Sequence, residues 1–298
     1  MSDPSLSQPV IAHDGTPLAS RVWPAWTTPE GRRLEGTRLA QGRLVIVHGF
    51  SEHSGRYAHV ASAFAARGWH AMAFDQRGHG ASPGRRGVLQ RFDSLIDDVL
   101  AVVRAATERL PTAGPTVVLG HSLGGLVTLR TLQTRSHEMK HAGVGAAVLS
   151  APWLGDVRGL PPGTRMVLRA LNVIAPDFAF PRKKRTDVLV ADEQIANDRQ
   201  RDPLVHSHIS AGLLAEVQRA QSKARPVALD RSLPLLVILP GDDRLFDDAI
   251  TRQWIAMAVQ KGSQIEVREW PGRRHEPLND VGRDEVIEHL VRWVDTHA

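Results

Sequence analysis

Short apolar runs alternate along this chain with segments of helical spacing, and this alternation constrains the fold more than any other feature. The runs lie at 44–47, 70–74, 116–119, 146–149, 235–239 and 265–270. The helical segments lie at 60–67, 95–109, 124–134 and 284–294. Apolar strands between amphipathic helices are typical of a parallel sheet covered on both faces. We therefore predict an α/β fold with a mostly parallel central sheet, preceded by a hairpin that turns at Asp14-Gly15.

Polar residues with catalytic potential follow directly after most of these runs. In a parallel sheet the carboxyl ends of the strands meet at one edge, and ligands bind in the crevice beside it. The residues that fall at these ends are His48-Gly49, Asp75, Ser122, Ser150, Gly241-Asp242-Asp243 and His275. We expect the functional site at this edge of the sheet.

The segment Gly120-His121-Ser122-Leu123-Gly124 matches the G-x-S-x-G pattern. It follows an apolar run and precedes a helical segment, which is the context that the pattern requires. A sharp strand-to-helix turn holds the serine backbone under strain, so the flanking positions must be glycine. The turn exposes the Ser122 hydroxyl and directs the Leu123 N–H, at a helix N-terminus, toward a developing oxyanion. Ser122 is therefore the predicted nucleophile.

A serine hydroxyl needs a base, and the base needs a third group that orients it. In folds of this kind the acid and then the histidine follow the serine along the chain. Asp242 and Asp243 both qualify as the acid by their order alone. Three histidines follow them, but His289 and His297 lie in or after the last helical segment, which leaves His275 as the predicted base.

A second oxyanion donor is expected from the loop after the run 44–47. There His48-Gly49-Phe50 follows the strand, and Gly49 lets the backbone approach a reacting carbonyl. The Phe50 N–H is the candidate donor, with a simple turn as the alternative reading.

The alternation breaks between about Asp156 and Asp230, where the sequence is interrupted by proline, helix-leaning and poor in strands. We predict a core formed by residues 1–155 and 231–298, with residues 156–230 inserted as a helical cap over the strand ends. The alternative is a pair of ordinary crossover helices with long loops.

Composition narrows the chemistry. The chain has no cysteine, which excludes disulfides, thiolate catalysis and Cys-ligated zinc. His206-x-His208 has no third ligand at metal spacing and no HExxH is present, so we expect no metal. No phosphate-binding or dinucleotide glycine motif appears, so we expect no cofactor. Arginines and aromatic residues are not interleaved as on a nucleic-acid-binding surface, so we expect no nucleic acid partner.

The start of the chain, MSDPSLSQPV, has neither the basic nor the apolar region of a signal peptide. The apolar runs are too short to span a bilayer. We expect a soluble cytoplasmic protein. The net charge of +5 favours anionic interfaces, although charge spread over a surface says little about a partner. The oligomeric state stays open.

Several stretches together resemble the monoacylglycerol lipase and lysophospholipase-like family of α/β-hydrolases. They are HGFSEHSGRY from His48, FDQRGHGASPGRRG from Phe74, GHSLGG from Gly120, RDPLV from Arg201, GDDRLFD from Gly241 and HEPLND from His275. The resemblance runs in order over roughly residues 9 to 295. It implies Asp243 as the catalytic acid. It departs from the family at Phe246, where a cysteine often stands, which bears on thiol sensitivity and not on catalysis.

The resemblance also implies that the cap lines an acyl-chain pocket and meets lipid. The apolar stretch 166–180 agrees, although packing against the core alone is the alternative. The substrate-binding candidates are Met166, Leu168, Leu171, Ile174 and Phe178. The basic run 181–185 that follows could meet anionic headgroups or be a solvated loop. Glu52, His53 and Arg56 are expected to brace the oxyanion loop through ion pairs.

These residues predict a serine carboxylic-ester hydrolase. Ser122, Asp243 and His275 form the predicted catalytic triad, and Phe50 and Leu123 form the predicted oxyanion hole. The substrate is expected to be a monoacylglycerol, with lysophospholipids and generic esters of short or medium chain length close behind. Transient contact of the cap with a membrane surface is expected as well. The alternatives are a peptidase or lactonase on the same scaffold, or a non-catalytic ligand-binding relative.

Overall fold

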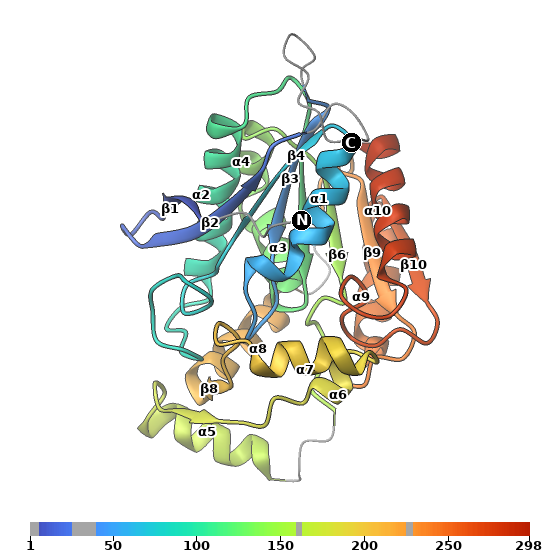
Figure 1. Ribbon diagram of the computed structural model, residues 1–298. Coiled ribbons are helices and arrows are strands. Elements are labelled where there is room, and N and C mark those ends of the chain that lie inside the picture. The colour runs from blue at the N-terminus through green and yellow to red at the C-terminus, as the bar shows by residue number, and fades with distance from the viewer. Residues whose placement is uncertain (1–5, 26–39, 159–162, 225–228) are drawn as a thin grey trace.

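An eight-stranded sheet crosses the molecule in the order β1-β2-β4-β3-β5-β6-β9-β10 (Figure 1). The computed structural model describes residues 6–25, 40–158, 163–224 and 229–298. The strands of this sheet are β1 (Ser7–Ile11), β2 (Pro17–Trp23), β3 (Gly42–Val47), β4 (Trp69–Phe74), β5 (Thr116–His121), β6 (Val144–Ser150), β9 (Leu235–Pro240) and β10 (Ile265–Trp270). The pairs β1–β2 and β2–β4 are antiparallel and all other neighbours are parallel. The predicted α/β fold, with its mostly parallel sheet and initial hairpin, is confirmed.

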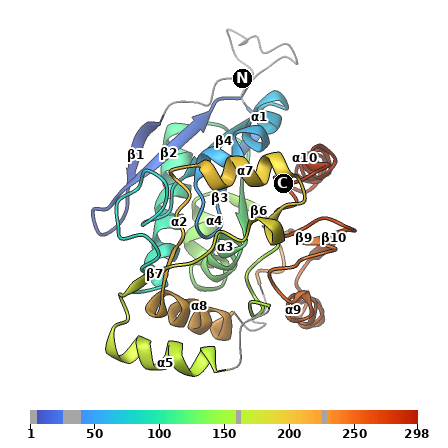
Figure 2. The ribbon, with the colours of Figure 1, turned by 60° about the horizontal axis from the view of Figure 1, so that its bottom comes forward.

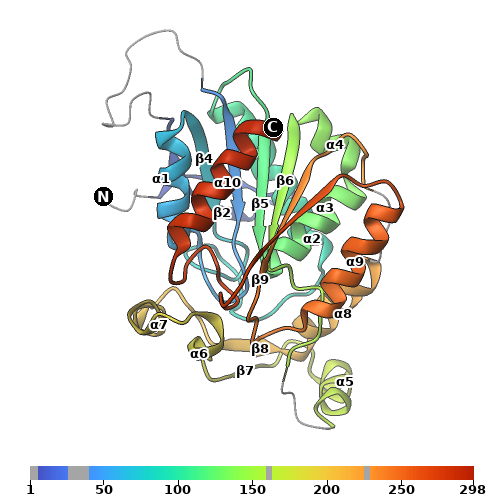
Figure 3. The same ribbon diagram turned by 90° about the vertical axis from the view of Figure 1, so that its right-hand side faces the viewer.

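Helices cover both faces of this sheet because its strands present apolar side chains alternately to each face. In β3, Leu44 and Ile46 belong to the apolar cluster that contains α1 (Ala58–Ala66) and α10 (Arg283–His297). Val45 and Val47 belong to the cluster that contains α2 (Asp93–Arg109), α3 (Leu123–Thr134) and α9 (Asp248–Gln260). Figure 3 shows α1 and α10 together in front of the sheet. The helices of the two layers are α1 (Ala58–Ala66), α2 (Asp93–Arg109), α3 (Leu123–Thr134), α4 (Ser136–His141), α9 (Asp248–Gln260) and α10 (Arg283–His297).

Two features of these layers differ from what the sequence suggests. The edge strand β10, with the sequence IEVREW, is half-buried or exposed along its whole length, whereas the other predicted strands are largely buried. Its charged residues fit an edge position, where only one neighbouring strand covers the backbone. Helix α9 was not predicted, although Thr251, Trp254, Ile255 and Ala258 are buried at helical spacing.

Residues 163–224, between β6 and β9, lie beyond the carboxyl ends of the strands (Figures 1 and 3). We call residues 163–224 the covering segment. It contains α5 (Thr164–Ile174), β7 (Ala179–Pro181), α6 (Thr186–Leu189), α7 (Glu193–Arg201), β8 (His208–Ser210) and α8 (Ala211–Lys223). The strands β7 and β8 form a separate antiparallel pair.

Helix α8 connects the covering segment to the rest of the molecule, since Leu213 and Val217 belong to the apolar core beside α3. Helix α5 packs on the outer side of α8, as Figure 2 shows. Within the described ranges, no helix combines the length and the apolar composition that crossing a membrane requires.

Candidate active site

The turn between β5 and α3 holds Ser122 in a strained backbone conformation, with φ 53° and ψ −114°. A Cβ atom at Gly120 would lie 2.4 Å from the Gly124 carbonyl oxygen, and one at Gly124 would lie 2.1 Å from that of Val47. Only glycine therefore fits at these two positions. The Ser122 N–H donates to the Ser150 carbonyl at 2.9 Å, which ties the turn to the neighbouring strand end. Strain of this kind persists only where the surroundings enforce it, and it is typical of functional sites.

His275 lies between Ser122 and Asp243 in a single line of hydrogen-bonding atoms. Its Nε2 is 2.9 Å from the Ser122 Oγ, and its Nδ1 is 2.8 Å from Asp243 Oδ2. All three side chains are buried. With the proton on Nδ1 facing the carboxylate, Nε2 is free to accept the proton of the serine hydroxyl.

The order of residues in the chain did not decide which of Asp242 and Asp243 contacts the histidine, and the structure does. Asp243 reaches His275, and its other oxygen accepts from the Leu245 N–H at 2.8 Å and the Phe246 N–H at 3.0 Å. Asp242 instead pairs with Arg244 on the outside of the loop. The two amide donors fix the Asp243 carboxylate, so one oxygen is always presented to the imidazole.

The surroundings of His275 change its basicity. Burial alone opposes protonation of the ring, but the charge of Asp243 and its hydrogen bond outweigh burial, with smaller contributions from Glu276 and Glu52. The pKa of His275 is raised above its ordinary value as a result. Burial likewise opposes ionisation of Asp243, but His275 and the two loop amides hold the pKa of this carboxyl below its ordinary value. The histidine is thus a strengthened base beside a fixed carboxylate.

The two predicted oxyanion donors flank the serine. Leu123 is the first residue of α3, and Phe50 follows Gly49 at the end of β3. A Cβ atom at Gly49 would lie 3.2 Å from the Ser122 Cβ, so the loop passes directly beside the nucleophile. Among the described residues, neither the Phe50 N–H nor the Leu123 N–H has an acceptor within the protein. Two free amide donors beside a hydroxyl can stabilise a negatively charged oxygen.

A buried ion-pair network lies directly behind the loop after β3. Glu52 accepts from the Gly49 N–H at 2.5 Å and from the Tyr57 hydroxyl at 2.8 Å. Arg56 pairs with Glu52 and, through its second terminal nitrogen, with Glu276 at 2.7 Å. Burial opposes ionisation of both glutamates, but the charge of Arg56 lowers the pKa of each. The predicted bracing by Glu52 and Arg56 is therefore present in the structure, and it extends to the residue after His275.

Further polar contacts join the covering segment to this region. Arg199 of α7 places its Nε 3.2 Å from Glu276 Oε1, and His53 Nε2 lies 2.7 Å from Asp202 Oδ2. Asp280 Oδ1, in the loop that carries His275, accepts from the N–H groups of Ala191 and Asp192 at 2.7 and 3.1 Å. Helix α7 is thus attached by ions and hydrogen bonds to the loops on either side of Ser122.

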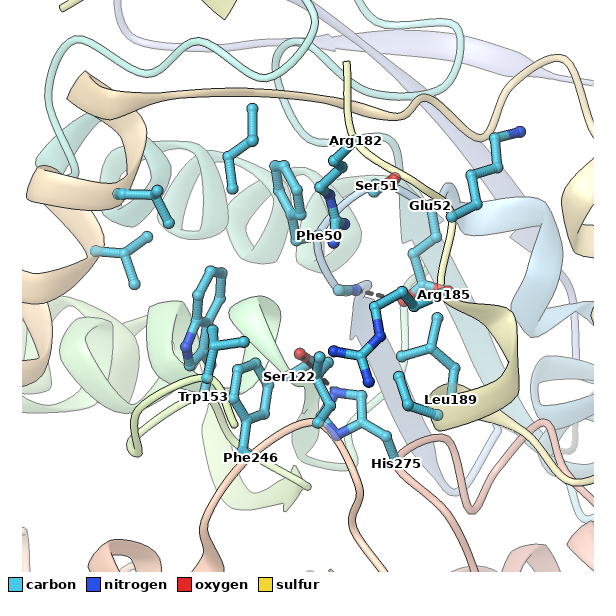
Figure 4. Close-up of a pocket in the computed structure, with 18 of the residues that line it drawn as sticks. Phe50, Ser51, Glu52, Ser122, Trp153, Arg182, Arg185, Leu189, Phe246 and His275 are labelled. Carbon is cyan, nitrogen blue, oxygen red and sulfur yellow. Dashed lines mark hydrogen bonds between the residues drawn. The ribbon is translucent and has the colours of Figure 1, made fainter. Parts of the chain in front are cut away.

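A cavity of about 280 Å³ opens over Ser122 and His275 (Figure 4). Its apolar lining comes from the core loops and from the covering segment alike. The apolar side chains of this lining are those of Phe50, Trp153, Val157, Leu168, Phe180, Val188, Leu189, Ile209, Leu214, Val217, Leu245 and Phe246.

The predicted substrate-binding residues of α5 and of the loop after it take different positions. Leu168 lines the cavity. Leu171 is half-buried but is not part of the lining, and Met166, Ile174 and Phe178 are 73%, 81% and 62% exposed. A helix turns only one face inward, and tertiary packing, which the sequence pattern does not show, decides which face of α5 turns toward Ser122. Trp153 and Phe246, which the prediction missed, lie just after the ends of β6 and β9, where a pocket of this fold is expected.

His206 lines the cavity without a hydrogen-bond partner for either ring nitrogen. Its ring packs against Phe50 and His79, with centroid distances of 5.2 and 4.8 Å. The Ser51 hydroxyl donates to its carbonyl oxygen. Within the part of the chain that the structure describes, no group of three or more histidine, aspartate or glutamate residues is arranged to hold a metal ion.

Comparisons with known proteins give a consistent picture. Residues 39–282 match the family described as serine aminopeptidase, S33. The chain is 30% identical to a monoacylglycerol lipase of Mycolicibacterium smegmatis over 93% of both chains. It is 28% identical to a phospholipase of Bacillus subtilis, over 85% of this chain and 95% of the relative. A soluble variant of the Saccharomyces cerevisiae monoglyceride lipase, solved with a substrate analogue, superposes with a TM-score of 0.82 at 19% identity, covering 100% of this chain and 97% of the other.

The turn at Ser122 gives a first prediction. The substitution Gly124→Ala places a Cβ atom against the Val47 and His48 carbonyl oxygens, and should cost about 1–3 kcal/mol of unfolding free energy or more. It should also slow the reaction of Ser122 with a fluorophosphonate, because the serine turn must shift. The control is Gly143→Ala, where φ is +79° but no atom lies within 4 Å. Equal labelling rates in the Gly124→Ala variant and the unchanged protein would contradict this account.

The raised pKa of His275 gives a second prediction. Only the neutral imidazole accepts the serine proton, so the labelling rate should fall as pH decreases through the pKa of His275. The midpoint of this fall should lie above 6.5, the ordinary value for histidine. Asp243→Asn removes the charge that raises the pKa, so it should move the midpoint down and slow labelling at every pH. A midpoint at or below 6.5 in the unchanged protein would speak against the described electrostatics.

Proposed function

The chain belongs to the monoacylglycerol lipase-like serine hydrolases of the S33 family, and on this premise we propose that it cleaves the carboxylic ester of lipids with a single acyl chain, with monoacylglycerol as the reference substrate. The observation that carries the proposal is the line of contacts from Ser122 through His275 to Asp243, beside a largely apolar cavity.

In the proposed mechanism, His275 Nε2 takes the proton of the Ser122 hydroxyl as its oxygen attacks the ester carbonyl. Asp243 stabilises the resulting imidazolium, and the Phe50 and Leu123 N–H groups bind the oxyanion. The imidazolium then protonates the leaving alcohol, and water hydrolyses the acyl-enzyme by the same route. Each oxyanion donor of this kind lowers the barrier by roughly 3 kcal/mol.

The cavity supports a substrate with one chain. Its volume of about 280 Å³ is near the lower end of the range of roughly 300–1,000 Å³ for small-molecule sites. Trp153, Leu214 and Val217 offer apolar contact in the cavity lining, so an acyl chain of moderate length would be desolvated there. A lipid with several chains would leave most of its apolar surface outside.

We propose residues 156–230 as a cap domain, of which the covering segment forms most. On α5 and the loop after it, the side chains of Met166, Val173, Ile174 and Phe178 are mostly exposed and apolar. Exposed apolar side chains on an outer amphipathic helix support transient contact with a lipid surface, from which a substrate would be drawn.

An aminopeptidase on the same scaffold would need a carboxylate to hold the free amine of its substrate. Three acids of the covering segment, Asp192, Glu193 and Glu216, do not line the cavity. Asp192 caps α7, Glu193 is exposed, and Glu216 accepts from the Phe92 N–H. Glu52 and Glu276 line the cavity but already pair with Arg56. The ester hydrolase reading is therefore favoured over the peptidase.

Substitution of the nucleophile tests the proposed mechanism. Ser122→Ala should lower the turnover of monooctanoylglycerol by at least about 10³-fold, because the acyl-enzyme can no longer form. Ser232→Ala, at an exposed serine far from the cavity lining, is the matched control and should keep full turnover. Fluorophosphonate labelling of the unchanged protein, lost only in Ser122→Ala, separates an enzyme from a ligand-binding relative. Turnover in the Ser122→Ala variant near that of the control would refute the mechanism.

A substrate pair tests the reaction class. The unchanged protein should hydrolyse monooctanoylglycerol and leave a proline amide intact, since the cavity offers no unpaired carboxylate to a substrate amine among the residues discussed above. The reverse preference would replace the ester hydrolase by a peptidase.

A further inference from the structure

Ser51, the residue after the proposed oxyanion donor Phe50, has a backbone conformation that serine seldom adopts. Its φ is +66°, in the left-handed region, where a Cβ atom crowds the backbone. Ser51 is buried beside Phe50 and belongs to the cavity lining (Figure 4). A conformation of this kind persists only where neighbouring groups enforce it. The contacts of Ser51 therefore bear on the position of Phe50.

The group that holds the Ser51 side chain belongs to the covering segment. The Ser51 hydroxyl donates to the carbonyl oxygen of His206, which lies 155 positions later in the chain, between α7 and β8. Two residues after Ser51, the His53 ring contacts Asp202, which precedes the same stretch of the covering segment. The loop after β3 is thus attached to residues 202–206 at two points.

The ring of His206 also packs against the Phe50 side chain. The two ring centroids are 5.2 Å apart, and the ring planes meet at 87°. Among the described residues, neither ring nitrogen of His206 has a hydrogen-bond partner, and the side chain is buried. Burial, with the charge of Arg86 as the next cause, lowers the pKa of His206 to about 3, so the ring is neutral at neutral pH. The ring of His206 therefore acts on Phe50 by packing.

The peptide group that carries the Phe50 N–H lies between two held residues. On one side, Glu52 accepts from the Gly49 N–H at 2.5 Å. On the other side, the covering segment holds Ser51 through His206. An oxyanion donor acts only when its N–H points to the place where negative charge develops. A rotation of the backbone at Ser51 would turn the Phe50 N–H away from that place.

We propose that Ser51 is a positioning residue, and that the covering segment completes the oxyanion hole by holding Ser51 in its left-handed conformation through His206. The proposal rests on the ester hydrolase function proposed above. It gives the covering segment a role in the chemical step, in addition to its role as part of the cavity lining. Because the Ser51 hydroxyl already donates to the His206 carbonyl, Ser51 acts through Phe50 and not by contact with the substrate.

Two substitutions of Ser51 separate its backbone conformation from its hydroxyl group. Ser51→Ala removes the hydrogen bond and keeps the cost of a positive φ, whereas Ser51→Gly removes both, because glycine adopts a positive φ without strain. The kcat for monooctanoylglycerol should fall about 10- to 100-fold in Ser51→Ala, since loss of a whole oxyanion donor costs roughly 10²–10³-fold. KM should stay within about threefold, because the contacts that bind the substrate are unchanged. Ser51→Gly should regain at least about half of the logarithmic loss in kcat.

Three outcomes of this comparison would overturn the proposal. The first is an unchanged kcat in Ser51→Ala. The second is an equal loss in Ser51→Ala and Ser51→Gly, because the hydroxyl would then matter and the backbone conformation would not. The third is a raised KM with an unchanged kcat, which would make Ser51 a substrate contact.

A second pair of variants tests the contribution of the covering segment. His206→Ala removes the ring that packs on Phe50 and should lower kcat about tenfold. His206→Phe keeps the ring and removes only nitrogens that have no partner, so it should regain most of this loss. In Ser51→Ala/His206→Ala the two losses should be less than additive in free energy, because both act through Phe50. Fully additive losses would contradict the proposal.

An inhibitor reports on the oxyanion hole directly. Octylboronic acid adds the Ser122 oxygen to its boron, and the resulting tetrahedral anion places a boron-bound oxygen in the hole. Its inhibition constant should rise across the variants in proportion to the fall in kcat. The inhibition constant of octanol, which forms no such adduct, should stay within about twofold. An equal weakening of both inhibitors would refute the proposal, since the whole cavity would then have changed.

The matched control is Ser222→Ala. The Ser222 hydroxyl donates to the Gln218 carbonyl at 2.9 Å within α8, so this variant removes a hydroxyl–carbonyl bond of the covering segment that does not reach the loop after β3. Its kcat should stay within about twofold of that of the unchanged protein, and thermal unfolding shows whether each variant is folded. A loss in Ser222→Ala as large as that in Ser51→Ala would overturn the proposal. No turnover by the unchanged protein would instead count against the proposed function itself.

Discussion

The contact of Arg56 with two carboxylates from distant parts of the chain underlies the geometry of the site. Glu52 holds the Gly49 N–H behind the oxyanion loop, and Glu276 follows the histidine that contacts Ser122. A buried ion network of this kind is weak evidence for stability, because removing the charges from water costs much of what their attraction returns. In this protein the network instead fixes the positions of two loops. The loop after β3 and the loop after β10 are both tied to the Arg56 guanidinium, which fixes the position of Gly49 relative to His275.

The strands and the sharp turn at Ser122 could be predicted because the information for them is local. An apolar run followed by Gly120-His121-Ser122-Leu123-Gly124 contains the strand, the turn and the helix start within one short stretch. The ion pair between Arg56 and Glu276 could not be predicted, because 220 positions separate the two residues and no local sequence pattern links them. Asp242 and Asp243 were equivalent by order, and only the direction of each side chain after β9 separates them.

The least predictable part was the orientation of the covering segment. Leu168 and Met166 are two positions apart on α5, yet one lines the cavity and the other faces outward. The basic run 181–185 gave no sign of direction either, although Arg182 and Arg185 point inward while Lys183 does not line the cavity. Helix phase and loop direction depend on tertiary packing, in this case on the seating of β7 against β8 and of α5 against α8. The net charge of +5 therefore could not show which basic residues lie at the cavity.

Two parts of the covering segment, α7 and α5, are attached to the rest of the molecule by different kinds of interaction. Around α7, Asp280 accepts from two backbone N–H groups and Arg199 pairs with Glu276. Moving this helix away would leave the buried Asp280 carboxylate without these donors. It would also disturb Glu276, which follows His275 in the chain. Helix α5 rests on α8 through side-chain packing and carries much of its apolar surface outward. Displacing α5 would consequently break fewer polar contacts than displacing α7, and it would leave the contacts around His275 in place. Such a division would let the α5 side of the covering segment shift while the α7 side keeps the residues around His275 in place.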